Sequence, residues 1–484
     1  MAVVAGIDSS TQSCKVEIRE AATGRLLGVG SAPHPPTTPP VSEQNPADWW
    51  TALTLAFGRA VKAAGVTAQD VKALGVAAQC HGLVLQDATG RVLRPVKLWN
   101  DLTSAPQATA MVQQLGKPAW AEAVGSVPTA AFTITKLAWM AAHEPDTLQR
   151  AASACLPHDY LTWKLTGALV TDRSEASGTG YYAAHEGRYR VDLIERFAGV
   201  THLRLPEVLG PSQAAGRVCA EAAAELGLPP DALVGPGGGD QHAGSLGLGL
   251  RTGQPLFTLG TSGVAMTVSE NSVHDPTGYV NGVCDTTGRY LPLVCTLNAT
   301  KVTDWFRRLL RLTTEEFDAL ALSVPPDQRS LTLAAFLDGE RSPDLPDAVG
   351  ILAGLSTATT DAQLARAAVD GVVLGLMAAF EAIESCGLVG PGPVVATGGG
   401  AASAAYRQSI ADFLQREVVV LDAGDAAARG VCLQAAAILD GAEVDELRDT
   451  WRPAIAQRAL PGQPVPAAIR ERYGKLAAYR ELDR

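Results

Sequence analysis

Residues 6–15 (GIDSSTQSCK) combine small residues, hydroxyls, a carboxylate and an amine in one short stretch. A turn between two strands exposes backbone N–H groups, and small residues let a phosphate approach them. Ser10 and Thr11 add hydroxyl donors, and Lys15 is long enough to reach phosphate oxygens. Asp8 offers an oxygen to a hard cation such as Mg²⁺. The stretch predicts a turn that binds phosphate and magnesium, and the alternative is an ordinary polar hairpin with solvated charges.

A second turn of the same chemistry follows in the second half of the chain, at residues 259–263 (LGTSG). Its Gly260, Thr261 and Ser262 offer backbone amides and hydroxyls. Two such turns in opposition would clamp the β- and γ-phosphates of a nucleotide from both sides. The chain has no GxxxxGK[ST] pattern, which excludes a P-loop as the phosphate site. No GxGxxG follows the first expected strand, so a dinucleotide-binding fold has no support.

A carboxylate, Asp240, follows three glycines at 237–239, where a helix is expected to begin. One interpretation is a helix N-cap. The other is a catalytic base that is oriented toward a hydroxyl group. A helix N-terminus favours the ionised carboxylate, so we expect a low pKa for Asp240. That would suit phosphoryl transfer, whose loose transition state needs positioning more than a strong base.

Three more segments carry chemistry of their own. Residues 398–401 (GGGA) lie between an expected strand and an expected helix, so their bare backbone can lie against a planar ring or a ribose, or simply form a tight turn. Residues 79–82 (QCHG) end a strand and hold polar groups at the edge of a cleft. Residues 99–101 (WND) combine aromatic packing with turn residues that could contact a sugar. Taken alone, His81 fits a structural histidine, and Cys80 fits a small packing residue better than a nucleophile.

The elements that position these residues alternate between strands and helices. A β-meander is expected over residues 3–7, 15–19 and 25–30, and a strand over 71–77 leads into the segment at 79–82. An amphipathic helix is expected over 46–64, because Pro46 stands in its first turn and Gly65 just past its end.

A second series of elements begins near residue 234 and repeats the pattern of apolar strand, hydroxyl-rich turn and apolar strand, with strands expected at 255–259 and 264–268. A capping-box pattern at Thr360 and Gln363 starts a long helix that Gly387 can stop. A short strand over 394–396 and a helix over 402–414 follow. The alternation of strands and helices predicts an α/β fold, and the repeated strand–turn–strand pattern predicts two similar lobes.

Composition limits the functional class. The chain has 484 residues, a net charge of −11, 47% hydrophobic and 18% charged residues, which indicates a globular protein. The acidic balance argues against nucleic acid or an anionic membrane as a partner. No apolar stretch approaches about 18 residues, and the N-terminus lacks the pattern of a signal peptide. Eight cysteines without close pairs exclude a CxxC site, argue against a disulfide scaffold and favour a cytoplasmic setting.

Together the motifs resemble the FGGY carbohydrate kinases, a family of the sugar-kinase, actin and heat-shock-chaperone ATPase superfamily. The resemblance runs from residue 6 to about 440 and is carried, in order, by GIDSSTQSCK, AAQCHG, WND, HDY, GGGDQHAG, LGTSG, FLDGERSP, GILAGL and GGGAAS. The Gln-x-His-Gly element at 79–82 and the Gly-Gly-Asp at 238–240 are most similar to the xylulokinase branch. Glycerol kinases carry an Arg-Glu pair in place of Cys80-His81, and gluconokinase-like and ribulokinase-like members remain alternatives.

The resemblance implies two actin-like (ribonuclease H-like) lobes, residues 1–235 and 236–484, with an ATP and sugar cleft between them. The first would hold the sugar side and the first phosphate loop, and the second would hold the second phosphate loop, the adenosine pocket and the catalytic Asp. The implied roles are Mg²⁺ and phosphate assistance for Asp8; phosphate contacts for Ser10, Thr11, Lys15, Gly260, Thr261 and Ser262; the adenosine pocket for Gly399, Gly400 and Ala401; sugar contacts or cleft support for Cys80, His81, Asn100, Asp101 and Gln241; and the catalytic base for Asp240.

The function implied by the resemblance is ATP-dependent phosphorylation of the terminal hydroxyl of D-xylulose, by an enzyme that works as a homodimer. Family members usually carry a Met-like residue where Cys80 stands and often Asn where Gln241 stands. These two departures bear on which sugar is preferred, so ribulose, gluconate and glycerol remain alternatives. A rival from another class is an actin-like motor or chaperone ATPase, which would use the same phosphate turns and need no sugar contacts.

Overall fold

A computed structural model describes residues 2–483, which form two compact units. Unit 1 comprises the chain up to Leu250 together with Glu270–Leu291 and Ala423–Pro453. Unit 2 comprises Arg251–Ser269, Pro292–Asp422 and the segment from Ala454 onward. Within the described residues, no helix is both long enough and apolar enough to cross a membrane.

The core of unit 1 is a mixed sheet whose strands run in the order β13-β14-β5-β1-β2-β3, with β15 also paired to β5. Strands β1, β2 and β3 form the predicted antiparallel meander, and β5 runs parallel to β1. The strands are β1 (Val3–Ser9), β2 (Ser13–Glu20), β3 (Leu26–Pro33), β5 (Val71–Ala78), β13 (Gly216–Arg217), β14 (Leu233–Val234) and β15 (Gly238–Gly239).

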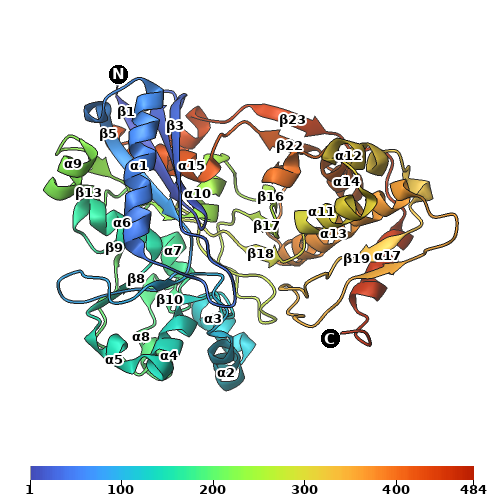
Figure 1. Cartoon of the computed structure of the whole chain (residues 1–484), viewed down its shortest axis with the longest axis horizontal. Coiled ribbons are helices and arrows are strands. Elements are labelled where there is room, and N and C mark those ends of the chain that lie inside the picture. The colour runs from blue at the N-terminus through green and yellow to red at the C-terminus, as the bar shows by residue number, and fades with distance from the viewer. Residues whose placement is uncertain (1, 484) are drawn as a thin grey trace. The chain divides into compact units, whose positions relative to one another are not determined.

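Two helices cover this sheet, α1 (Pro46–Ala64) and α15 (Ala426–Asp440) (Figure 1). Glycines let both approach closely, since a Cβ on Gly30 would lie 2.1 Å from Ala56 O and one on Gly6 would lie 1.9 Å from Ala428 O. The predicted bounds of α1 are confirmed, with Gly65 ending the helix at φ +67°.

The remaining elements of unit 1 are short and surround the sheet. The helices are α2 (Ala105–Leu115), α3 (Lys117–Val124), α4 (Thr133–His143), α5 (Pro145–Arg150), α6 (Pro157–Thr166), α7 (Arg173–Ser177), α8 (Val191–Ala198), α9 (Ala220–Leu226), α10 (Asp240–Gly247) and α16 (Val444–Thr450), with the 3₁₀ turn η1 (Ala68–Asp70). Four strand pairs complete it: β4 (Glu43–Gln44) with β7 (Val96–Lys97), β6 (Val84–Gln86) with β8 (Ser153–Cys155), β9 (Val170–Asp172) with β12 (Glu207–Leu209), and β10 (Tyr182–Ala183) with β11 (Arg188–Tyr189).

The sheet of unit 2 repeats the pattern of unit 1. Its order is β18-β17-β16-β21-β22-β23, so an antiparallel meander again has a parallel strand beside its first member. The strands are β16 (Pro255–Leu259), β17 (Gly263–Thr267), β18 (Leu293–Thr296), β21 (Val394–Thr397), β22 (Val418–Leu421) and β23 (Ile455–Ala459). The predicted α/β class and the predicted duplication are both confirmed.

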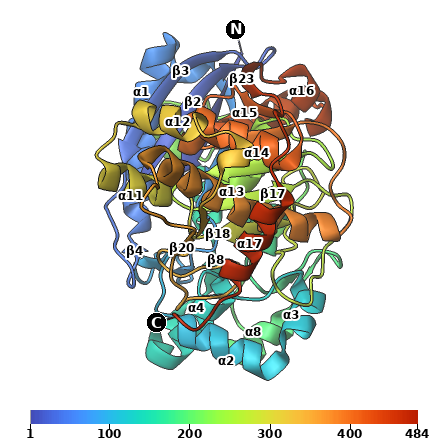
Figure 2. The ribbon, with the colours of Figure 1, turned by 90° about the vertical axis from the view of Figure 1, so that its right-hand side faces the viewer.

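The long helix α13 (Asp361–Ser385) packs against β17, β18 and several helices of unit 2, among them α14 and α17 (Figure 2). It begins with the predicted capping box. The other elements are α11 (Thr300–Leu310), α12 (Thr314–Leu322), α14 (Ala404–Leu414), α17 (Ala467–Ala477), β19 (Thr332–Ala334), β20 (Ile351–Ala353) and the 3₁₀ turns η2 (Pro326–Gln328) and η3 (Gly399–Ala402). The start of α14 was predicted two residues early, because residues 399–402 form a tighter turn and Ser403 caps the helix.

The compact units do not follow the predicted division at residue 235/236. Strand β15 pairs with β5, and α10 packs against α15, so residues 236–250 fold with unit 1. Asp240 therefore lies in unit 1, together with the other predicted sugar-binding residues, whereas the sequence-based division had placed it in the second lobe.

Candidate active site

Three parallel strands of unit 1 end at one edge of the sheet. Ser9, the last residue of β1, and Gly239, the last of β15, both pair with Ala78, the last of β5. Ser10 follows β1, Gln79 and Cys80 follow β5, and Asp240 follows β15. Since ligands of α/β sheets bind at the carboxyl ends of parallel strands, this edge brings most of the residues predicted for chemistry in unit 1 together.

The Asp8 carboxylate lies at this edge, 5% exposed, and both of its oxygens accept from Ser10 Oγ at 2.7 Å. Burial raises its pKa well above the ordinary value, and the nearby carboxylates of Asp425 and Asp240 raise it further. Ser10 and Lys15 act in the opposite direction. Asp8 is thus a carboxylate whose charge needs a positive partner.

Lys15 stands opposite Asp8 in the β1–β2 register, and its ammonium forms an ion pair with Asp425 Oδ2 at 3.0 Å. Asp425 also caps α15, because its Oδ1 accepts from Ala428 N at 3.0 Å. Sequence reasoning missed Asp425, although its position just before an alanine-rich helix is typical of an N-cap. The structure adds this third carboxylate to the pair that was predicted.

The cluster around Asp8 fits a hard cation on the chemistry of its donors. Three carboxylates, Asp8, Asp240 and Asp425, act on one another through their charges, with Lys15 the ammonium that pairs with Asp425. Carboxylate oxygens are the ligands that Mg²⁺ prefers, and a divalent cation would offset the repulsion that raises the pKa of Asp8. Asp8 is the residue best placed to hold it.

The hydroxyls of the first turn are used within unit 1. Ser10 Oγ donates to Asp8, while Thr11 Oγ1 accepts from Trp99 Nε1 at 2.9 Å and donates to Gln79 Oε1 at 3.3 Å. These bonds fix the shape of the turn. A phosphate at this place would therefore be met chiefly by backbone N–H groups, with Lys15 beside them.

Asp240 is the first residue of α10 and not its N-cap, which is Gly239. Its Oδ1 accepts from Gln241 N at 2.7 Å and lies 3.8 Å from Cys80 Sγ. The expectation of a low pKa is wrong in direction: desolvation raises the pKa of Asp240 to about 6, more than these two bonds lower it. Asp240 remains ionised at neutral pH and is basic enough to accept a proton.

Cys80 keeps its proton. Burial raises the pKa of its thiol well above 9, and the carboxylates of Glu175 and Asp240 raise it further. A thiol of this kind is a weak donor and a poor nucleophile, in agreement with the sequence-based interpretation.

Cys80, Glu175 and His242 form a group whose ligand atoms lie within 4.8 Å of one another, a spacing that a metal ion could bridge. The centre of the group is already filled. A Cβ on Gly239 would lie 2.5 Å from His242 Nδ1 and 2.6 Å from both Cys80 Sγ and Glu175 Oε1. An ion bound by all three would have to lie near that point, one bond length from Gly239 Cα, so the group packs around this glycine and does not form a metal centre.

His81 adopts a left-handed backbone conformation, φ +67°, which is uncommon outside glycine. Its Nδ1 lies 2.6 Å from Gly178 O, its ring stacks on Phe132 at 5.0 Å between centroids, and its backbone oxygen accepts from Thr133 Oγ1 at 3.1 Å. Because a carbonyl only accepts, Nδ1 carries a proton and donates it to Gly178 O. Backbone strain that is held by several contacts is typical of a functional site.

Asn100 and Asp101 differ in what their side chains can do. Asp101 is fully buried, and its carboxylate accepts from Ser42 N at 2.8 Å and from Thr103 N at 3.1 Å. It is thereby a support for the surrounding loops and is not presented to a ligand. Asn100 Oδ1 is buried without a hydrogen-bond partner in the protein, so it is available to accept a hydrogen bond from a ligand. Gln241 is exposed on the first turn of α10.

Unit 2 places its two predicted nucleotide-binding turns on neighbouring strands. Thr258 of β16 pairs in parallel with Thr397 of β21, so the turn at 260–262 and the turn at 398–401 leave the same sheet edge. A Cβ on Gly398 would lie 2.7 Å from Leu259 O, whereas one on Gly399 would meet nothing within 4 Å. Thr261, Ser262 and Gly399 are exposed, while Ala401 is buried. This sheet edge therefore presents the hydroxyls of Thr261 and Ser262 next to the glycine backbone at Gly399.

The chain matches two family models along most of its length. Residues 3–247 match the N-terminal domain of the FGGY family of carbohydrate kinases, and residues 256–439 match the C-terminal domain of that family. Both matches follow the order in which the motifs occur.

Individual relatives agree with the family models. A xylulose kinase of Streptomyces coelicolor is 41% identical over 453 residues, 93% of this chain and 91% of the relative, and one of Streptomyces rubiginosus is 40% identical with the same coverage. The crystal structure of a xylulose kinase from Bifidobacterium adolescentis superposes with a TM-score of 0.86 at 37% identity, covering 98% of this chain and 99% of that one.

Proposed function

This chain belongs to the FGGY family of carbohydrate kinases, and on that premise we propose that it transfers the γ-phosphoryl group of ATP to the terminal hydroxyl of D-xylulose, giving D-xylulose 5-phosphate. The relatives of 40% identity or more that are named xylulose kinases support this choice of sugar. Membership in a family of kinases leaves the actin-like motor without support.

The observation that carries the proposal is the shared edge of β1, β5 and β15, which presents a carboxylate cluster, a sugar-binding candidate pair and a base from three consecutive strand ends. Asp240 acts as the catalytic base. Its carboxylate orients the sugar hydroxyl for in-line attack, accepts its proton as the O–P bond forms, and ADP departs. A base with a pKa near 6 remains ionised at pH 7 and can still hold a proton late in the reaction.

The sugar is oriented by the residues around this base. The imidazole of His81 contacts one sugar hydroxyl, Asn100 and Gln241 offer amide groups, and the Cys80 thiol lies against the sugar beside Asp240. Asp101 acts indirectly, since its bonds hold the loops that carry these groups. Each contact depends on side-chain shape, so Cys80 and Gln241 are the positions most relevant to a preference for ribulose or gluconate over xylulose.

For ATP, the proposed phosphate contacts in unit 1 are the backbone N–H groups of Ser10 and Thr11 with Lys15. In unit 2 they are Gly260, Thr261 and Ser262, and the proposed adenosine contacts are Gly399, Gly400 and Ala401. Bound at Asp8, Mg²⁺ would neutralise charge on the transferring phosphoryl group. We also propose that the enzyme works in the cytoplasm as a homodimer, and light scattering of the purified protein tests the dimer.

The test is Asp240→Asn assayed with ATP and, in turn, xylulose, ribulose, gluconate and glycerol. We expect wild-type turnover to be highest with xylulose, and the variant to lose about 10²–10⁴-fold of it, while a non-hydrolysable ATP analogue still binds. Asp440→Asn, at the exposed end of α15, serves as the matched control and should keep full turnover. Near-normal turnover in Asp240→Asn would reject the assigned base, and preference for another sugar would reject xylulose.

A further inference from the structure

Lys136 is a fully buried lysine in the first turns of α4, where three local effects disfavour a positive charge. Burial removes water from its ammonium, and the ammonium of Lys97 acts on it as a like charge. The N-terminal end of a helix also repels cations. A residue that violates local rules in this way is expected at a functional position.

The Lys136 ammonium is bound by backbone oxygens of the preceding loop. It donates to Ala130 O at 3.2 Å, to Ala131 O, and to Phe132 O at 3.4 Å. We refer to these three oxygens as the carbonyl cradle. Thr135 Oγ1 also donates to Phe132 O, at 2.8 Å, and Ser104 Oγ donates to Ala130 O, at 3.1 Å. Lys136 thus contacts three successive carbonyls at once, and the two hydroxyls add bonds to two of them.

The cradle ends at the residues that hold His81. Phe132 supplies the ring on which His81 stacks, and Thr133 supplies the hydroxyl that donates to His81 O. The left-handed backbone of His81 needs such restraint, because a non-glycine residue is strained there. Loosening the loop at 130–132 would therefore weaken two of the restraints on His81 and leave the contact of its Nδ1 with Gly178 O.

We propose that Lys136 is a positioning residue for the sugar: its charge fixes the carbonyl cradle, and the cradle holds His81 through Phe132 and Thr133. The role of His81 toward the sugar rests on the proposed function. The contacts that link Lys136 to His81 do not include the Asp240 carboxylate, so the loss of Lys136 should weaken sugar binding more than it slows phosphoryl transfer.

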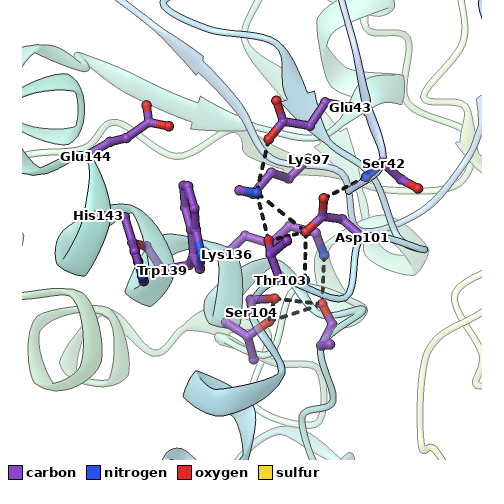
Figure 3. A network of polar contacts seen from close by, with 12 residues as sticks. Ser42, Glu43, Lys97, Asp101, Thr103, Ser104, Lys136, Trp139, His143 and Glu144 are labelled. Carbon is purple, nitrogen blue, oxygen red and sulfur yellow. Dashed lines mark hydrogen bonds and ion pairs between the residues drawn. The ribbon is translucent and has the colours of Figure 1, made fainter. Parts of the chain in front are cut away.

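The surroundings of Lys136 make this arrangement sensitive to pH. Figure 3 shows Lys136 close to Lys97 and Asp101, whose charges act on its ammonium. Desolvation lowers the pKa of Lys136 to about 7, Lys97 lowers it too, and Asp101 acts in the opposite direction. Glu43 faces the other side of Lys97 at 3.0 Å. Below pH 7 the ammonium holds the cradle, and above it the neutral amine binds the carbonyls more weakly.

The first experiment compares Lys136→Met with the wild-type protein and with Lys164→Met, a partly buried lysine of α6 that packs over Trp50. We expect Lys136→Met to raise KM for the sugar about tenfold, the loss of charge-assisted hydrogen bonds, with kcat and KM for ATP within twofold. Wild-type KM for the sugar should rise between pH 6 and 8.5, and that of Lys136→Met should be high and flat. Equal loss of kcat, or parallel pH profiles, would overturn the proposal.

A double-variant cycle tests the route through Phe132. Phe132→Leu removes the ring that stacks on His81, so we expect its KM effect and that of Lys136→Met to overlap, and the double variant to exceed the larger single effect by less than twofold. Multiplicative effects would show that Lys136 acts elsewhere. If Lys136→Met does not fold, Phe132→Leu and the wild-type pH profile still decide, because the proposal requires a flattened profile when the stacking ring is absent.

A measurement without sugar separates this proposal from the proposed function. The protein is labelled with 4-fluorophenylalanine, and the ¹⁹F signal of Phe132 is assigned by its absence in Phe132→Leu. We expect Lys136→Met to shift or broaden that signal and Lys164→Met to leave it unchanged. An unchanged signal in Lys136→Met contradicts the cradle even if the enzyme phosphorylates xylulose, and a changed signal supports it even if another sugar is the substrate.

Discussion

At the residue scale, burial decides the chemistry of Asp240. A helix N-terminus by itself suggested a low pKa, and the position in the sequence carried no sign of how little water reaches the carboxylate. Desolvation outweighs the bonds from Gln241 N and Cys80, and the pKa rises to about 6. The residue type and its spacing from three glycines were therefore readable from the sequence, whereas its proton affinity required the packed structure.

This pKa predicts an acid limb in the rate. Asp240 must be ionised to accept the proton, so kcat/KM for the sugar should fall about tenfold per pH unit once the pH is well below 6. Rates are measured from pH 5 to 8 with Asp440→Asn in parallel and with circular dichroism to show that the protein stays folded. A rate that stays constant down to pH 5 would contradict the assignment of the base.

Asp425 carries a second prediction at this scale. Asp425→Asn keeps an N-cap on α15 but removes one carboxylate beside Asp8 and frees Lys15. We expect stability to change by less than about 1 kcal/mol, and the Mg²⁺ concentration for half-maximal rate to rise about fivefold, because the negative potential at Asp8 weakens. Asp440→Asn, at the other end of α15, should leave the Mg²⁺ dependence unchanged, and an unaltered dependence in Asp425→Asn would refute the argument.

At the element scale, local signals located α1, α13 and most of the meander strands of both sheets, whereas most of the short helices and the division into units were not predicted. Pro46 and Gly65 marked both ends of α1 in the sequence, because each acts on the backbone of its own turn, and the structure adds Asn45 as the N-cap. The start of α14 was displaced by the 3₁₀ turn at 399–402, which resembles a helix in sequence. Nothing in the sequence indicated that Lys136 is buried, because its hydrogen-bond partners are backbone oxygens of a loop without a recognisable motif.

The crossing of α10 and α15 gives a prediction about stability. A Cβ on Gly430 would lie 1.9 Å from Ala243 O, so the backbones touch where the helices cross. Gly430→Ala must push the helices apart and should lower the free energy of unfolding by about 3 kcal/mol or more. Gly58→Ala on α1 meets nothing within 4 Å and should raise it by about 0.5–1 kcal/mol. Urea unfolding compares the two, and equal effects would contradict the close crossing.

At the scale of the whole molecule, the chain returns to unit 1 after leaving it. Residues 270–291 and 423–453 belong to unit 1 although they follow segments of unit 2. A division of the linear sequence into two halves could not show this, because the return of residues 423–453 is revealed only by the packing of α15 against β1, β5 and α10. The family and the repeated sheet pattern were accessible from motifs alone.

The return of α15 predicts how fragments behave. A fragment of residues 1–250 lacks the helix that packs on Gly6 and Gly75, so one face of its sheet is uncovered. We expect it to show no cooperative thermal transition, and addition of a peptide spanning 423–453 to restore one. A peptide of α13 residues 361–385 is the control and should not. A cooperative transition of the fragment alone would contradict the assignment of α15 to this core.

The buried amine of Lys136 also affects how the folding stability of the protein depends on pH. Its pKa is 10.5 in a free chain and about 7 in the fold, so between these values the unfolded chain binds more protons and unfolding becomes harder as the pH rises. The urea midpoint of the wild-type protein should therefore gain on that of Lys136→Met between about pH 7 and 9. A mildly alkaline buffer would then stabilise the folded protein while it lowers the affinity for the sugar. The best pH for storing this kinase and the best pH for assaying it would therefore differ.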